Sequence, residues 1–376
     1  MSNQKLTILG IITAGMIVWA VVQSGISSKP GTEQTAPSYL IQGLNPADID
    51  SIVVGRADKT VTLKRRQEGF VVVEKDNYPA AASRINELIT KCLDIRTAEL
   101  YTDDRANHDD LGVAEEQAEA VVRFLKADSA LLTGVVIGLT RETGQGTYVR
   151  LVDDDKVYVT LERPWVNDWA MNYIDQSLIE VDDDAVESVT VSGPNEVYTL
   201  TKTGQTGAVV LEPMPAGSRP KADEYQYVLT AVKNLRFDDV SRQSGLKEKL
   251  DFDRRFTCTL KDSTVYTLNI AQSDGKTYVT CDAEFTDPQP VTKEKTVESE
   301  EQLKQKEAKL LARDKANEFS ARHKGWIYQI SDYKAKLMVK KLSELVETEK
   351  PADQAKQVSD DDSSTAGDTG LSGQGT

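Results

Sequence analysis

The chain has 376 residues, more than one hydrophobic core usually supports, so at least two domains are expected. Its formal net charge of -15 argues against nucleic-acid binding, because phosphate contacts need clustered Lys and Arg side chains. The same acidity argues against a protein that lies flat on anionic lipid.

Residues 1–28 predict a short cytoplasmic end followed by a transmembrane anchor. The run Leu6–Val22 is almost wholly apolar, and at about 1.5 Å per residue the segment can cross roughly 30 Å of hydrocarbon. Trp19 suits the membrane interface, and Lys5 gives a positive-inside bias that places the following residues outside the cytoplasm. The alternative is a signal peptide cleaved ahead of Gly25. We therefore expect a single-pass protein of the inner (cytoplasmic) membrane whose bulk is periplasmic.

A flexible linker is expected at residues 29–45, where Ser, Pro, Thr and Gly are frequent. Residues 46–180 then predict a first α+β module. It has a helix at Ile85–Ile95 with an apolar stripe, and a second helix at Trp165–Ile179. Alternating apolar and polar residues predict seven strands, at residues 52–54, 61–63, 71–73, 121–125, 134–139, 147–152 and 157–161.

Residues 181–345 repeat this order, which indicates a tandem duplication. The stripe of the first helix recurs at Tyr225–Leu235, and Thr147–Val149 recurs literally at Thr277–Val279. A mostly antiparallel sheet with helices packed on one face is the expected architecture of each module, an α+β fold. The remaining expected elements are strands at residues 186–191, 198–200, 209–211, 256–260, 266–270, 276–280 and 326–330, and a closing helix at 335–345.

The two modules differ at one hairpin, where residues 286–325 form a charged insertion. Ser299 and Gln302 have the spacing of a capping box, so one long, charged helix is expected. Beyond the second module, residues 346–376 are rich in Pro, Asp, Ser, Thr and Gly and predict a disordered acidic tail. The apolar residues of the insertion helix form only a narrow seam: Leu303, Leu310 and Leu311.

The three cysteines predict packing roles. They cannot all pair, and none has the spacing of a metal site. Cys92 belongs to a helix stripe, where a free thiol behaves as a small apolar side chain. Cys258 and Cys281 fall on expected strands that are two apart, beyond the reach of a disulfide.

No catalytic, cofactor-binding or metal-binding residue is predicted, because no known motif for such a site is complete. The two histidines, His108 and His323, lie in charged sequence that is expected to be exposed. Gly275–Thr277 resembles the end of a phosphate-binding loop, but Ile270 replaces the required Gly, so a hairpin turn is predicted. Three acidic triplets are predicted to be solvated turns, not cation sites: Asp153–Asp155, Asp182–Asp184 and Asp360–Asp362.

Short motifs recur in the two modules. An Ile-x-x-Ile-x-Val strand begins at Ile49, and a Gly-Phe hairpin follows at Gly69. The step Leu111–Val113 is echoed at Ser244–Leu246, and each module has a Tyr-Val strand. In these residues the chain resembles the domain-of-unknown-function 4340 family over nearly all of residues 40–345. The resemblance implies an auxiliary component of ABC-type transport systems of the kind linked to gliding motility, beside a permease and an ATPase, and it implies no functional residues.

The resulting hypothesis is a membrane-anchored, extracytoplasmic accessory protein that is not an enzyme and needs no cofactor. Its expected partners are the membrane and envelope proteins, in particular an ABC-type permease, and not nucleic acid. The sequence names no small-molecule ligand. Two alternatives stay open: an envelope hydrolase acting on glycan through carboxylates in a cleft between the modules, and a purely structural envelope spacer.

Overall fold

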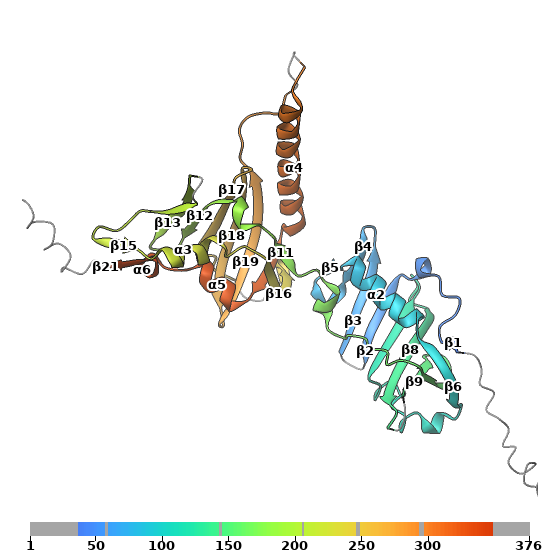
Figure 1. Ribbon diagram of the computed structural model, residues 1–376. Coiled ribbons are helices and arrows are strands. Elements are labelled where there is room, and N and C mark those ends of the chain that lie inside the picture. The colour runs from blue at the N-terminus through green and yellow to red at the C-terminus, as the bar shows by residue number, and fades with distance from the viewer. Residues whose placement is uncertain are drawn as a thin grey trace, which may run out of the picture. The chain divides into compact units, whose positions relative to one another are not determined.

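The computed structural model describes residues 37–348, apart from 57–58, 143–144, 205–206, 246–248 and 293–296. The chain divides between Asp175 and Gln176 into two compact units, each built on its own sheet (Figure 1). Every strand pairing in these described ranges is antiparallel, which confirms the expected α+β class with antiparallel sheets.

The first unit is built on a ten-stranded sheet. Its order is β1-β6-β10-β9-β8-β7-β2-β3-β4-β5. Strands in the middle of this sheet are rich in buried Val and Ile, as a two-sided core requires. The strands are β1 (Ser38–Tyr39), β2 (Ser51–Arg56), β3 (Lys59–Arg66), β4 (Gly69–Val72), β5 (Tyr78–Pro79), β6 (Arg96–Thr102), β7 (Ala120–Leu125), β8 (Leu131–Thr140), β9 (Thr147–Leu151) and β10 (Val157–Thr160).

Helix α2 (Ala82–Leu93) covers part of this sheet (Figure 1). Its predicted stripe is buried, with Ile85, Leu88, Ile89 and Cys92 all turned inward. The three- and four-residue spacing of these side chains gives one apolar face, so the helix is held by packing.

The second unit is built on a nine-stranded sheet with the order β11-β16-β20-β19-β18-β17-β12-β13-β14, and a two-stranded sheet of β15 and β21. Its helices are α3 (Ala222–Leu229), α4 (Glu300–His323), α5 (Asp332–Met338) and α6 (Leu342–Leu345). The strands are β11 (Ser177–Ile179), β12 (Val186–Ser192), β13 (Val197–Thr203), β14 (Ala208–Glu212), β15 (Ser218–Pro220), β16 (Leu235–Arg242), β17 (Arg254–Leu260), β18 (Thr264–Ser273), β19 (Lys276–Phe285), β20 (Trp326–Ile330) and β21 (Val346–Thr348).

The two large sheets share one strand order. Each strand of the second sheet occupies the place of the first-sheet strand whose number is ten lower, so that β11 corresponds to β1 and β14 to β4. Only β5, at the edge of the first sheet, has no counterpart in the second sheet. The literal repeat has the same pairing in both: Tyr148 on β9 opposes Val159 on β10, and Tyr278 on β19 opposes Gln329 on β20. This shared order is what a tandem duplication predicts.

The helix expected at Trp165–Ile179 is wrong. The chain is extended there, with a 3-10 turn at Ala170–Tyr173, and it ends in strand β11. Asn167 explains the local conformation, because its side chain accepts a hydrogen bond from the Trp169 amide at 2.9 Å and its carbonyl accepts one from the Tyr173 hydroxyl at 2.5 Å. Side-chain bonds of this kind compete with a helix. Because β11 pairs with β16, the units divide five residues before the expected boundary at residue 180.

Other expected helices are shorter than the patterns indicated. The stripe Tyr225–Leu235 is only partly helical, since α3 ends at Leu229 and Leu235 begins strand β16. The closing helix at residues 335–345 is divided into α5 and α6. The first residues of the expected disordered tail, Val346–Thr348, pair as β21 with β15, while the rest of that tail lies outside the described residues.

The predicted anchor at residues 1–28 and residues 29–36 of the expected linker also lie outside the described residues. The remainder of that linker is not a free spacer, because Ser38–Tyr39 form β1 and the side chains of Leu40 and Ile41 are buried. Within the described residues, no helix is both long and apolar enough to cross a membrane.

Candidate functional site

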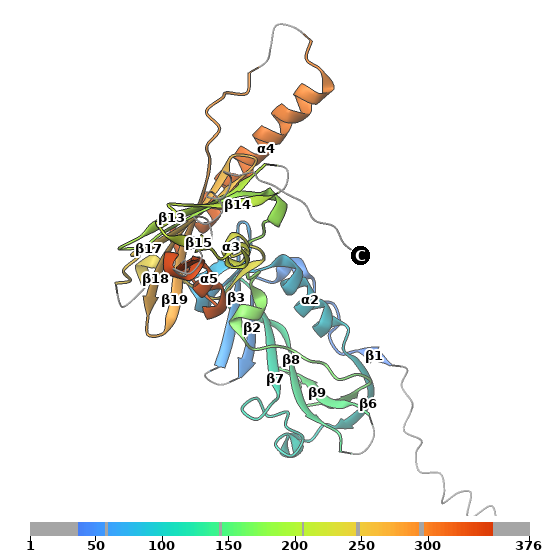
Figure 2. The same cartoon turned by 60° about the vertical axis from the view of Figure 1, so that its left-hand side comes forward.

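The feature that distinguishes the second unit is helix α4, which stands out from its sheet between β19 and β20 (Figures 1 and 2). Its predicted capping box is confirmed. The Ser299 hydroxyl accepts a hydrogen bond from the Gln302 amide at 3.3 Å, and the Gln302 side chain accepts one from the Ser299 amide at 2.9 Å. Glu300 and Glu301 place negative charge in the first turn, which favours the start of the helix.

Only the C-terminal half of α4 packs on the sheet. Ala312, Ala316 and His323 are its buried residues, and their small or flat side chains let the helix approach β19 closely. Ser320 joins the two elements: its hydroxyl lies 2.5 Å from Asp282 Oδ1 and 2.6 Å from the Ala283 carbonyl oxygen, and it accepts a hydrogen bond from the Ala283 amide at 3.0 Å. These contacts fix the base of the helix.

His323 is buried at this base, so its predicted exposure is wrong. Its Nδ1 atom lies 2.6 Å from the Tyr328 hydroxyl, and its ring packs on Phe319 with centroids 4.3 Å apart. Burial, aided by the neighbouring Arg322 charge, lowers the pKa of His323 to about 4. The residue is therefore neutral at pH 7 and acts in packing.

His108 is also buried, contrary to the prediction. It lies in the acidic loop of the first unit, and its Nε2 atom is 2.9 Å from the Asp155 carbonyl oxygen. This contact ties the loop to the turn between β9 and β10. One residue of a charged stretch can be buried while the charged side chains next to it stay in contact with water.

A cavity of about 410 Å³ lies at the base of α4, and it contains serine, histidine and carboxylate side chains. They do not form a nucleophilic triad. In the part of the chain that the structure describes, the Ser320 hydroxyl is bonded to Asp282 and Ala283, the His323 Nδ1 atom to Tyr328, and no hydrogen bond joins Ser320 to His323. A triad needs the histidine to accept the serine proton.

The opposite side of α4 carries its leucines. Leu303 and Leu310 are seven residues apart and therefore lie on one face, roughly half a turn round the helix from the buried Ala312 and Ala316. Leu303 is 53% exposed, and Leu311, on the adjoining face, is 52% exposed. The predicted seam thus exists, but it faces outward and not toward the sheet. We call Leu303, Leu310 and Leu311 the outer leucines.

The segment that precedes α4 runs along a different side of the helix. Lys306 Nζ lies 2.5 Å from Glu298 Oε1 and 2.6 Å from the Thr292 carbonyl oxygen, and Lys309 Nζ lies 2.6 Å from Asp287 Oδ2. These contacts tie the N-terminal half of α4 to its own incoming chain. They leave the outer leucines uncovered.

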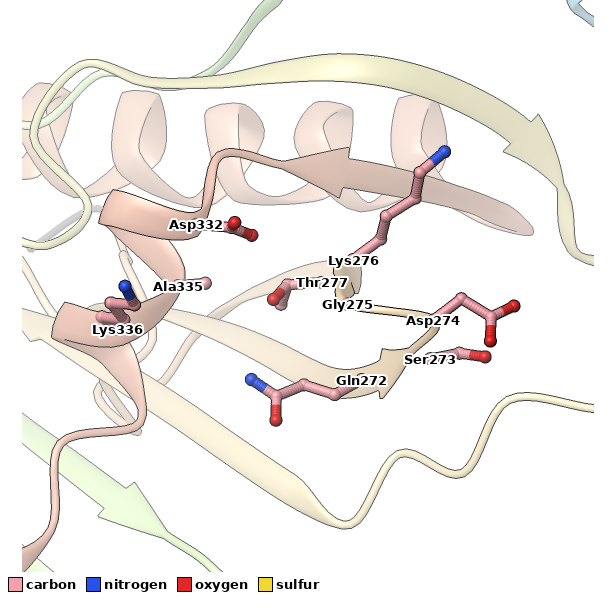
Figure 3. Close-up of a pocket in the computed structure, with 9 residues that line it drawn as sticks. All are labelled: Gln272, Ser273, Asp274, Gly275, Lys276, Thr277, Asp332, Ala335 and Lys336. Carbon is pink, nitrogen blue, oxygen red and sulfur yellow. The ribbon is translucent and has the colours of Figure 1, made fainter.

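Gly275–Thr277 forms the hairpin turn that the sequence predicts. Ser273 pairs with Lys276, and Asp274 and Gly275 have positive φ values of 50° and 72°, as a tight two-residue turn requires. The turn borders a cavity of about 320 Å³ beside α5. Figure 3 shows Lys276 and Asp274 pointing away from α5, so the arrangement does not gather positive charge as a phosphate site would.

Within the described residues, the cysteines and the acidic triplets Asp153–Asp155 and Asp182–Asp184 form no metal or redox centre. All three cysteines are free and buried, and burial raises the pKa of Cys92 and of Cys258 to about 12. Among the described residues no group of three or more His, Cys, Asp or Glu is arranged to hold a metal ion. The triplet Asp360–Asp362 lies outside the described residues. The carboxylate pair of the hydrolase alternative and the spacer alternative stay predictions.

Sequence reasoning missed the set of side chains at the base of α4. The spacing of Phe319 and His323, four residues apart and followed by the alternating strand Trp326–Ile330, was the signal that this part of the helix packs inward. The pairing of Ser320 with Asp282 has no local signal, because the two residues are 38 positions apart in the chain.

These features define a class of protein: two repeated antiparallel-sheet units, the second bearing a projecting helix with an apolar outer face. Residues 71–255 match the model of the domain of unknown function DUF4340. This part of the chain therefore carries the DUF4340 domain, as its motifs indicated. The matched range runs from β4 to the start of β17 and excludes α4. No curated protein and no solved structure matches the chain.

Proposed function

We propose that the chain is a single-pass, membrane-anchored accessory protein that works outside the cytoplasm and binds partner proteins through α4. The partner class is an envelope protein, in particular the permease of an ABC-type transport system. The observation that carries this proposal is the outward position of Leu303, Leu310 and Leu311 on a helix whose opposite face packs on the sheet.

The energetics of the outer leucines support a binding role. A leucine side chain contributes about 1.5–3 kcal/mol when it passes from solvent to a packed interface, so three of them form a useful hydrophobic centre. They are rimmed by charged neighbours: Lys304 and Glu300 form an ion pair 2.7 Å apart, and Arg313 is exposed. An apolar centre with a charged rim is the composition of a protein-binding helix face.

The rigidity of α4 also supports this role. The helix is capped at its start, tied to its incoming segment by two lysines, and fixed at its base by Ser320. A surface that is already ordered loses little conformational entropy when a partner binds.

The test is co-purification of the full chain from detergent-solubilised membranes of the source cells. We compare the wild type with a Leu303→Glu/Leu310→Glu double variant, because buried charge at the centre of an interface opposes binding. Ala308→Glu is the control, since it adds one of the same carboxylates to an exposed position on a different side of α4. The thermal unfolding of each purified variant shows whether the fold is kept.

The proposal predicts that a permease or another envelope protein accompanies the wild type and the Ala308→Glu control, and that the double variant loses it. Recovery of the same partner with the double variant contradicts a role for the outer leucines. Recovery of no envelope protein with the wild type contradicts the accessory function itself.

A further inference from the structure

A second cavity lies entirely within the first unit and within the range matched to the family. Its volume is about 300 Å³. The last turn of α2, the start of β6 and the segment that leaves β10 surround it. Cavities of a few hundred Å³ suit small ligands, and this one is bordered by a solvent-exposed tryptophan.

Trp165 forms the aromatic wall of this cavity, and 63% of its surface is exposed. Lys91 Nζ, on the last turn of α2, lies 5.6 Å from the centroid of this ring, and Pro164 precedes Trp165 in the same wall. An exposed aromatic ring in the wall of a cavity is available for contact with a ligand. The Trp165 ring therefore offers an aromatic surface on which a ligand can stack.

The rim of the cavity is polar and carries both signs of charge. Asp94, Arg96, Glu162 and Arg163 all line it, and Arg96 forms an ion pair with Glu162. Carboxylates accept hydrogen bonds and guanidinium groups donate them, so the rim can pair with neutral groups that do both. Its mixed charge favours neither a phosphate nor a metal cation.

We propose that this cavity binds a saccharide, with one sugar ring stacked on Trp165 and its hydroxyl groups bonded to the charged rim. A pyranose ring has a face of C–H groups and an edge of hydroxyls that both donate and accept hydrogen bonds. The aromatic wall matches the face, and the paired carboxylate and guanidinium groups match the edge. The site is distinct from the outer leucines of α4, so it goes beyond the proposed function.

The alternative ligands fit less well. An apolar peptide would contact Trp165, Pro164 and little else, and it would remove water from the charged groups of Asp94 and Arg163 without offering them hydrogen bonds. Insertion into lipid would have the same cost for the charged rim. A hydroxyl-rich ring replaces the water around these groups without leaving them unpaired.

The test is calorimetric titration of the full chain in a detergent that has no sugar headgroup. The probes are maltotetraose, galactobiose and tetra-N-acetylchitotetraose, followed to about 10 mM because sites with one stacking ring bind weakly. Trp165→Ala removes the stacking wall, while Trp165→Phe keeps an aromatic face. Trp169→Ala is the control, since Trp169 is 54% exposed on the same segment but does not line the cavity.

We expect saturable binding of at least one probe, about tenfold weaker or absent in Trp165→Ala and largely kept in Trp165→Phe and Trp169→Ala. Saturable binding of none of the three saccharides overturns the proposal. Equal losses in Trp165→Ala and Trp169→Ala also overturn it. The α4 double variant should bind the saccharide normally, so failure here leaves the partner proposal standing.

Discussion

His323 Nδ1 lies 2.6 Å from the Tyr328 hydroxyl, across the junction between the end of α4 and strand β20. The pair is buried, and Phe319 covers the imidazole ring. The insertion helix is therefore joined to the sheet through a titratable residue that must stay neutral.

This relationship predicts a pH dependence of stability. The pKa of His323 falls from an ordinary 6.5 in the unfolded chain to about 4 in the folded one. The unfolded state then binds the proton more readily, so stability is full above pH 6.5 and is lost as the pH falls toward 4. The loss amounts to roughly 3 kcal/mol at about 1.4 kcal/mol per pKa unit.

Urea unfolding of the second unit between pH 7 and pH 4 measures this effect. The His323→Gln variant keeps a polar partner for Tyr328 but does not titrate, so its stability should change less over this range. The carboxylates contribute the same background to both proteins. Identical pH profiles for the wild type and His323→Gln would exclude the mechanism.

The burial of Ala316 indicates that α4 lies close against its sheet, and a larger side chain at this position tests that contact. Only 1% of its surface is exposed, so Ala316→Leu has no room for the added carbon atoms and should cost about 1–3 kcal/mol. Ala308→Leu adds the same atoms at an exposed position of the same helix and should change stability by less than about 0.5 kcal/mol. Thermal unfolding of the two variants distinguishes a packed helix base from a loose one, for which both values would be small.

The Leu111–Val113 step of the first unit packs directly against Gly138, which leaves no room for a side chain there. A Cβ atom on this β8 residue would lie 2.5 Å from the Leu111 carbonyl oxygen and 2.6 Å from Val113 Cγ1. Gly138→Ala should therefore push the step away and cost about 1–3 kcal/mol. Gly193→Ala is the control, because its nearest neighbour is 3.8 Å away. Amide hydrogen exchange of β7–β9 should accelerate only in the first variant, and unchanged exchange there would contradict the close contact.

The cysteines should be unreactive in the folded protein. Burial raises the pKa of Cys92 and Cys258 to about 12 and raises that of Cys281 further, so almost no thiolate is present at pH 8. An aromatic disulfide reagent should label none of the three in buffer and all three in denaturant. Rapid labelling of a thiol without denaturant would show that this thiol is accessible and not packed.

Much of the fold was readable from local sequence patterns. Alternating residues located most of the strands, although not β6 or β16. The stripe of Ile85 and Leu88 located α2, and Ser299 with Gln302 located the start of α4. These signals are strong because each depends on neighbours within one turn or one strand. The candidate sites were much less predictable: the outer leucines were recognised as a narrow seam, but the tryptophan cavity was not, since Trp165 was assigned to a helix.

The amino-acid sequence by itself determined the repeat, most of the strands, helix α2, the insertion helix and the family resemblance, because periodicity, capping and turn chemistry are local properties. Only the tertiary structure decided which face of α4 is buried, that His323 is neutral, and that Trp165 lines a cavity with Asp94. Burial depends on residues that are distant in the chain. The hydrogen bond between Ser320 and Asp282 and the ion pair between Arg96 and Glu162 form only when the sheets bring these residues together. A hydrophobic pattern predicts that a side chain will be buried, but the residues around it in the folded protein decide whether it is.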